Sequence, residues 1–61
     1  MYRMVFTSGV VREFSCWETV LARFPYPVYY LAQSTEIDNL TYVHTRTGLV
    51  GCLYHYEQPV P

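Results

Sequence analysis

The first fourteen residues alternate between apolar and polar side chains, with one interruption near the middle. Residues 2–6 and 10–14 read as two strands, and the three-residue loop between them ends in Gly9, which is typical of a β-hairpin. A loop of this length sets Arg3 opposite Glu13, so that the two charges pair across the ladder. The opposite face of the hairpin then collects its large apolar and aromatic side chains, Tyr2, Met4, Phe6, Val10 and Phe14.

The spacing of apolar residues becomes helical directly after this hairpin. Ser15 and Glu18 have the separation of a capping box, in which each side chain binds a free amide at the start of a helix. Apolar residues then recur at i, i+3, i+4 and i+7, which predicts one buried stripe on a helix of about ten residues. Pro25 ends the helix because a proline disfavours the helical conformation in the residue before it. The stripe consists of Trp17, Val20, Leu21 and Phe24.

Three further strands are expected in the second half of the chain. They are rich in β-branched and aromatic residues and cover residues 28–33, 40–45 and 49–56. A polar turn at 34–39 joins the first of them to the second, and a loop ending in Gly48 joins the second to the third. The last residues, 58–61, include two prolines and are expected to form a frayed tail.

This order of elements predicts the α+β class. We expect a single domain over residues 1–61, in the order β-β-α-β-β-β, with an antiparallel sheet and one helix packed on one of its faces. A chain of 61 residues has room for only a small core and buries about 60% of the surface that it exposes when unfolded. Removal of the largest stripe side chain, in Trp17→Ala, should therefore cost about 3–5 kcal/mol and unfold much of the protein.

The register of the second hairpin stays open because two loops fit the sequence. A three-residue loop ending in Gly48 places Tyr42 on one face with Cys52 and Tyr54. A two-residue loop that also ends in Gly48 groups Tyr42 with Leu53 instead. A slip of one residue therefore exchanges the core and surface sides of these strands.

The composition is dominated by seven tyrosines, and arginine is the only strong base because the chain has no lysine. Tyrosine and arginine are the residues that protein interfaces concentrate. An apolar content of 51% with 15% charged residues excludes a disordered chain of low hydrophobicity. The formal net charge of -1 is too small to draw the chain onto nucleic acid or an anionic membrane.

We expect a cytoplasmic protein that is not associated with a membrane. No apolar run approaches the roughly 20 residues that cross a bilayer, and the N-terminus lacks the apolar stretch of a signal peptide. Cys16 and Cys52 are too few for the disulfide framework of a secreted protein. We expect free thiols, with a single bridge between them as the alternative.

Residues with metal-binding or catalytic chemistry are few. Cys16, His44, Cys52 and His55 are zinc-ligand types, but Cys52 and His55 lie three apart on one strand and so point to opposite faces. Cys16 at a helix start would have a lowered thiol pKa, yet nothing in the sequence places a histidine beside it as a base. We therefore expect no metal, no cofactor and no enzymatic activity.

Protein binding is the function that this composition favours. Tyrosines offer rigid contact area with a polar tip, and an arginine at a hairpin tip can pair with a partner's carboxylate. The alternatives are a single-stranded nucleic-acid binder that stacks bases on sheet tyrosines and a small structural or oligomerising protein. The few arginines argue against nucleic acid. The residues expected at the partner surface are Tyr29, Tyr30, Tyr42, Arg46, Tyr54 and Tyr56.

The hairpin of residues 5–14, which runs directly into the helix start at residues 15–18, resembles small accessory proteins of phages and mobile elements. These include anti-CRISPRs and phage inhibitors of host enzymes. The resemblance implies a non-enzymatic inhibitor in the host cytoplasm that occupies the surface of a host protein or defence complex, with a homodimer as a further option. A charge near neutrality favours steric blocking over mimicry of nucleic acid.

Overall fold

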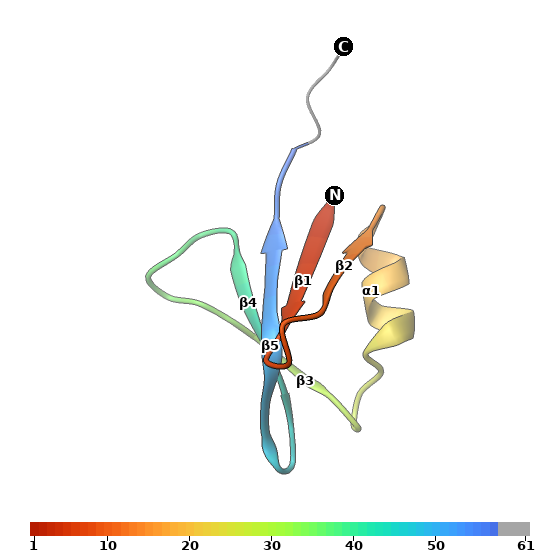
Figure 1. Cartoon of the computed structure of the whole chain (residues 1–61), viewed down its shortest axis with the longest axis vertical. Coiled ribbons are helices and arrows are strands. Elements are labelled where there is room, and N and C mark those ends of the chain that lie inside the picture. The colour runs from red at the N-terminus through yellow and green to blue at the C-terminus, as the bar shows by residue number, and fades with distance from the viewer. Residues whose placement is uncertain (58–61) are drawn as a thin grey trace.

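The computed structural model describes residues 1–57, which form five strands and one helix (Figure 1). The strands make one antiparallel sheet with the spatial order β2-β1-β5-β4-β3. The α+β class, with five antiparallel strands and one helix in the described residues, is confirmed; the predicted tail at 58–61 lies outside them. The elements are β1 (Tyr2–Phe6), β2 (Val11–Phe14), α1 (Trp17–Arg23), β3 (Tyr30–Gln33), β4 (Leu40–Thr45) and β5 (Gly48–His55).

The first hairpin has the predicted register. Gly9 closes its loop with a φ of +94°, a conformation that glycine adopts without steric cost. Arg3 faces Glu13 and Tyr2 faces Phe14, and Arg3 Nη2 donates a hydrogen bond to Glu13 Oε1 at 3.0 Å. The register thus places the ion pair and the aromatic side chains on opposite faces of the hairpin.

The core lies between α1 and one face of the sheet. The Phe24 ring is 1% exposed and contacts the rings of Phe6, Phe14 and Tyr29 at centroid distances of 6.1, 5.9 and 5.2 Å. These rings belong to β1, β2 and the connector before β3, so one side chain at the end of the helix joins three other segments. The remaining fully buried side chains of this cluster are Met4, Val20, Val43 and Leu53.

Strands β1 and β5 approach each other closely at Gly51. A Cβ atom at this position would lie 2.6 Å from Met4 Cε and 2.9 Å from Phe6 Cα, which is inside the contact distance of packed carbon atoms. Gly51 also pairs with Val43 on β4. The absence of a side chain here therefore allows the central strands to pack against the core.

The helix begins one residue later than predicted and is shorter. Its N-cap is Cys16 rather than Ser15, and α1 spans seven residues. Ser15 is instead part of the bend that leads from β2 into the helix. The predicted capping box is wrong because Glu18 is then the second helical residue, whereas the box requires the third. Cys16 Sγ lies 3.1 Å from the hydroxyl oxygen of that third residue, Thr19.

Only half of the predicted helical stripe is fully buried. Val20 is 0% and Phe24 1% exposed, whereas Trp17 is 36% and Leu21 45% exposed. The Trp17 ring packs on the ring of Tyr2, with the centroids 5.5 Å apart. A helix of seven residues presents few positions to the sheet, so the flanks of the stripe remain at the surface.

Strand β3 begins at Tyr30, two residues later than predicted. The amide of Tyr29 donates to the carbonyl of Pro25 at 3.0 Å, and this turn carries the Tyr29 ring onto Phe24. Val28, which the sequence places in the strand, is 60% exposed. The connector between α1 and β3 is therefore longer than expected and presents apolar surface.

The second hairpin resolves the open register through a bulge. Its loop is the two-residue pair Arg46-Thr47, because Thr45 pairs with Gly48. This differs from both predicted loops. A register shift between Val43 and His44 then adds one residue on β5, and Tyr42 pairs with Cys52. Tyr42 therefore lies on the same face as Cys52 and Tyr54, as the predicted three-residue loop requires, although the observed loop has two residues.

Candidate partner-binding surface

One face of the sheet lies opposite the helix, and we call it the open face. Along β1, β4 and β5, the fully buried residues Met4, Val43 and Leu53 point toward the core. Since successive side chains alternate between the faces of a sheet, their neighbours point away from it. These neighbours include Tyr42 on β4 and Tyr54 on β5. Among the described residues no helix covers this face (Figure 1), although Leu40, which pairs with Tyr54, is only 4% exposed.

The open face carries three tyrosines on neighbouring strands. Tyr42 on β4 lies directly opposite Cys52, which is two residues from Tyr54 on β5. Two residues further along β4, the His44 ring lies 6.2 Å from the Tyr42 ring, and His44 pairs with Tyr30 on β3. The aromatic side chains of this face are therefore distributed over β5, β4 and β3.

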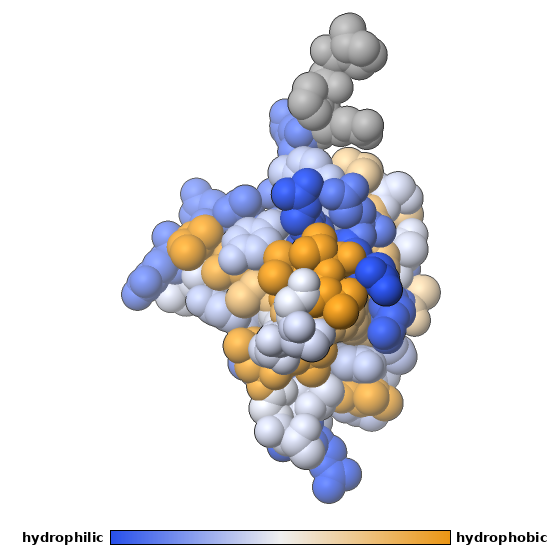
Figure 2. All heavy atoms as spheres, viewed as in Figure 1, coloured by the Kyte–Doolittle hydropathy of each residue, from blue (hydrophilic) through white to orange (hydrophobic). Residues whose placement is uncertain are grey.

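Apolar side chains extend this surface onto the first hairpin. Val5 pairs with Cys52 on one side and with Val11 on the other, and Val11 is 47% exposed. Figure 2 shows apolar side chains gathered over β1 and β2, with strongly hydrophilic side chains along the upper and right-hand border of the patch. An apolar centre with a polar border is the usual anatomy of a protein-binding surface.

A groove of about 670 Å³ lies at the end of the open face near the β4–β5 loop. It brings together two of the predicted residues, Tyr30 and Arg46, and its other lining residues include Pro27 and Val28. The Tyr26 ring, which is 79% exposed, stands edge-on to Tyr30 with the centroids 5.8 Å apart. The groove thus combines exposed apolar and aromatic groups with one guanidinium.

One of the six predicted residues lies apart from this arrangement. Tyr29 packs on Phe24 and is part of the core periphery, so it supports the fold. Tyr56 follows the end of β5, where its amide donates to the carbonyl of Met1 at 2.9 Å, and it borders the open face because Arg3 Cζ lies 5.1 Å from its ring centroid. The remaining four, Tyr30, Tyr42, Arg46 and Tyr54, belong to the open face or its groove.

The connector residues of the groove were missed by sequence reasoning. The pattern predicts Val28 as the start of a strand and assigns no surface role to Tyr26 or Pro27. The available signal was Pro25, since two prolines around Tyr26 hold the chain outside regular hydrogen-bonded structure. An apolar residue after such a segment can remain at the surface.

Charge on the open face is largely compensated. Arg3 is paired with Glu13, whose hydrogen bond and negative charge raise the pKa of Arg3 above its ordinary value. Arg12 pairs with Met4 in the ladder and so belongs to the helix-covered side. Arg46 at the β4–β5 loop is then the cation of the groove. The open face offers aromatic and apolar contact with little net charge.

Thiol and imidazole groups are dispersed over the molecule. The pKa of Cys16 is lowered, chiefly by its hydrogen bond with the Thr19 side chain and then by the backbone of Thr19. Cys16 is free at the N-cap of α1, and Cys52 is free on the open face. His55 packs on the ring of Tyr2, with centroids 4.8 Å apart. Within residues 1–57, no three potential metal ligands form a cluster.

Comparison with known proteins finds no matching family, no matching curated protein and no matching solved structure. In the described part of the chain, no helix has the length and apolar character needed to cross a bilayer. The function is therefore inferred from the surface that the fold itself presents.

Proposed function

We propose that this chain is a non-enzymatic protein-binding module that docks through its open face and the adjoining groove. The observation that carries the proposal is that Tyr54, Tyr42 and Tyr30 share one face on three neighbouring strands, and that Tyr30 lines a groove together with Arg46. Tyrosine and arginine are the residues that most often dominate the binding energy of an interface. The three tyrosines lie on strands of one sheet, which holds them in fixed positions and lowers the entropic cost of binding.

The charges of the open face support a protein partner rather than nucleic acid. Binding to single strands combines stacking with a positively charged groove that follows the phosphates. Here Arg3 is neutralised by Glu13, and the overall net charge is -1. Tyr30, Tyr42 and Tyr54 could stack bases, but the electrostatic part of such a site is limited to Arg46.

Occlusion is the mode of action that suits this surface. A sheet face of aromatic and apolar side chains covers an area of a larger protein without requiring a deep pocket, in agreement with the expected phage-type inhibitor. We place the interaction in the cytoplasm, where the two free thiols, Cys16 and Cys52, would remain reduced.

Site-specific photo-crosslinking tests the proposal. Benzoylphenylalanine replaces Tyr42 on the open face in one sample and Glu18 on the exposed side of α1 in a control sample. Both proteins are irradiated in lysate from cells of the natural source, and the adducts are analysed before and after nuclease treatment. We expect a discrete, nuclease-resistant protein adduct from position 42 that an excess of unlabelled wild-type chain removes.

Three outcomes would contradict the proposal. A nuclease-sensitive adduct from Tyr42 would favour the nucleic-acid alternative. An adduct that contains only a second copy of this chain would favour the oligomerising alternative. Equal labelling from Glu18 and Tyr42 would mean that the open face has no special role in binding.

A further inference from the structure

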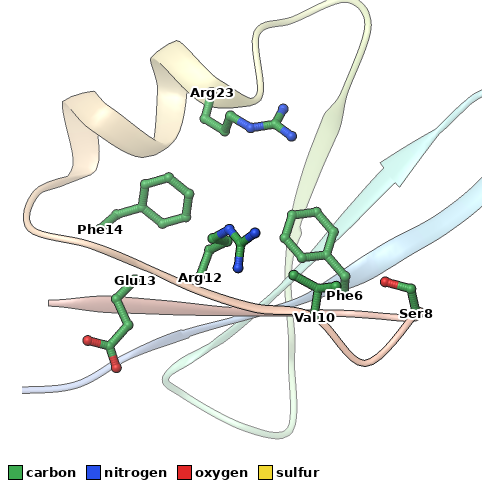
Figure 3. Close-up of a pocket in the computed structure, with 7 residues that line it drawn as sticks. All are labelled: Phe6, Ser8, Val10, Arg12, Glu13, Phe14 and Arg23. Atoms are coloured by element: carbon green, nitrogen blue, oxygen red, sulfur yellow. The ribbon is translucent and has the colours of Figure 1, made fainter.

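A second, smaller pocket lies on the other side of the molecule, between the first hairpin and the end of α1. Its volume is about 320 Å³, which is at the lower end of the range for small-molecule sites. Arg12 from β2 and Arg23 from the last turn of α1 both line it. In Figure 3 the Arg12 guanidinium lies between Phe6 and Phe14, and the Arg23 guanidinium extends from the end of the helix on the same side of the hairpin. Two cations thus line one pocket.

Neither guanidinium has an acidic partner in the described residues. The ion pair there is between Arg3 and Glu13. Glu13 also borders the pocket, but its carboxylate is held by Arg3 and points away from Arg12 and Arg23 in Figure 3. Two like charges that share a pocket repel each other, and an anion between them would remove that repulsion.

The contacts that these arginines do make leave donors free. Arg12 Nη1 donates to the backbone carbonyl of its neighbour Val11 at 3.0 Å. The Arg23 guanidinium carbon lies 5.1 Å from the ring centroid of Phe24, a cation–π contact that holds the group in place without using its N–H donors. Each guanidinium has five N–H donors, so most of them remain available to a ligand.

The walls of the pocket favour a ligand with an apolar body. Phe6 and Phe14 supply two aromatic walls, and Val10 supplies an aliphatic one. Val10 is 42% exposed, so a ligand would remove apolar surface from water in addition to pairing with charge. Ser8 provides a hydroxyl at the rim. A flat carboxylate matches the planar fork of a guanidinium.

We infer that this pocket binds a small organic acid, in which a carboxylate pairs with Arg12 and Arg23 while an apolar or aromatic group packs on Phe6 and Phe14. The site is separate from the open face, since Arg12 and Phe14 lie on the helix-covered side of the sheet. Its occupation therefore does not depend on the protein-binding function proposed above.

Titration of the whole chain with benzoate tests this inference, and two-dimensional amide NMR follows the binding. We expect saturable shifts at the amides of Arg12, Phe14 and Arg23. Benzamide has the same shape without the charge, and inorganic phosphate has charge without an apolar body. Benzoate should bind more tightly than both, because it alone uses the arginines and the rings together.

Three variants with the same change in charge provide the control. Arg12→Gln and Arg23→Gln should each weaken benzoate binding about tenfold, as expected for the loss of a charge-assisted hydrogen bond. Arg46→Gln, at the distant β4–β5 loop, should bind benzoate like the wild type. All three arginines are exposed, so the fold is expected to remain intact, and the amide spectra report this directly.

The inference is overturned by any of three results. Equal affinities for benzamide and benzoate would mean that the arginines do not contribute. Tighter binding of phosphate than of benzoate would mean that Phe6 and Phe14 do not contribute. Wild-type affinity in both Arg12→Gln and Arg23→Gln would show that benzoate binds elsewhere.

Discussion

The Phe24 side chain is predicted to be the most sensitive point of the fold. It is 1% exposed and touches three other aromatic rings, so Phe24→Ala should lose the full cost of a large aromatic truncation, about 3–5 kcal/mol. A chain of this length has a total stability of about 3–9 kcal/mol. The variant should therefore lose between about a third and all of the stability of the protein.

Trp17 provides the comparison because the sequence alone predicts the same cost for it. Trp17 is 36% exposed and has the Tyr2 ring as its aromatic neighbour. Scaling the cost of a full aromatic truncation by the buried fraction gives about 2–3 kcal/mol for Trp17→Ala. This variant should remain folded in buffer, with a lower midpoint of unfolding.

Urea denaturation followed by far-UV circular dichroism measures both variants, since this signal does not depend on the tryptophan. If Phe24→Ala is already unfolded in buffer, Phe24→Leu supplies a measurable value and should cost less than about 1.5 kcal/mol if its site can repack. A loss for Trp17→Ala equal to or greater than the loss for Phe24→Ala would refute the reasoning. So would a loss below about 1 kcal/mol for Phe24→Ala.

Three further predictions concern a close strand contact, a thiol and an ion pair. Gly51→Ala should destabilise the protein by more than about 2 kcal/mol, because the added Cβ overlaps β1, and thermal unfolding measures this. Alkylation of Cys16 in the folded chain should reach half its maximal rate at a lower pH than in urea, because Thr19 favours the thiolate, and Thr19→Val should shift that midpoint upward. A double-mutant cycle at Arg3 and Glu13 should give a weak coupling that added salt reduces further, since both side chains are exposed.

Each of these predictions has a matched control. Gly9→Ala introduces a side chain where no atom lies within 4 Å, so only the strain of its positive φ remains and the loss should be near 1 kcal/mol; an equal loss at Gly51 would contradict the overlap. The alkylation is measured in a Cys52→Ser background, and an unchanged pH midpoint in Thr19→Val would contradict the role of that hydroxyl. A coupling at Arg3 that does not respond to salt would argue against a solvent-exposed pair.

The first hairpin could be predicted from the sequence because its signals are local. The loop ending in Gly9 fixes the alternation, and that alternation alone places Arg3 opposite Glu13. The number and type of elements followed from hydrophobic spacing in the same way. Local rules were sufficient wherever a turn residue and the side-chain pattern agreed.

The second hairpin could not be predicted in detail because a bulge separates its loop from its register. A two-residue loop at Arg46-Thr47 would by itself shift Tyr42 to the other face, and the extra residue on β5 restores it. The extra residue lies between Leu49 and Gly51, so the loop residues carry no signal of it. The predicted helix start was wrong by one residue because Ser15 belongs to the bend after Phe14, and Cys16 is the N-cap.

The candidate site was predictable in its residue types but not in its boundaries. Strand propensity selects Tyr29 and Tyr30 equally, yet the turn at Pro25 sends Tyr29 to the core and leaves Tyr30 at the surface. The smaller pocket, which Arg12 and Arg23 line, had no signal in the sequence. Arg12 and Arg23 come together only because α1 returns along β2.

The affinity of the cross-linked partner for variants of the open face tests the central claim most directly. The double variant Tyr30→Thr/Tyr42→Thr removes two rings and keeps strand-forming residues. The control, Leu21→Ala, removes a side chain from the helix that is 45% exposed, close to the 42% of Tyr30. We predict that the double variant binds at least about 30-fold more weakly, as loss of an interface hot spot does, and that Leu21→Ala binds like the wild type. An unchanged affinity of the double variant, or an equal loss in Leu21→Ala, would contradict the assignment of the open face as the binding surface.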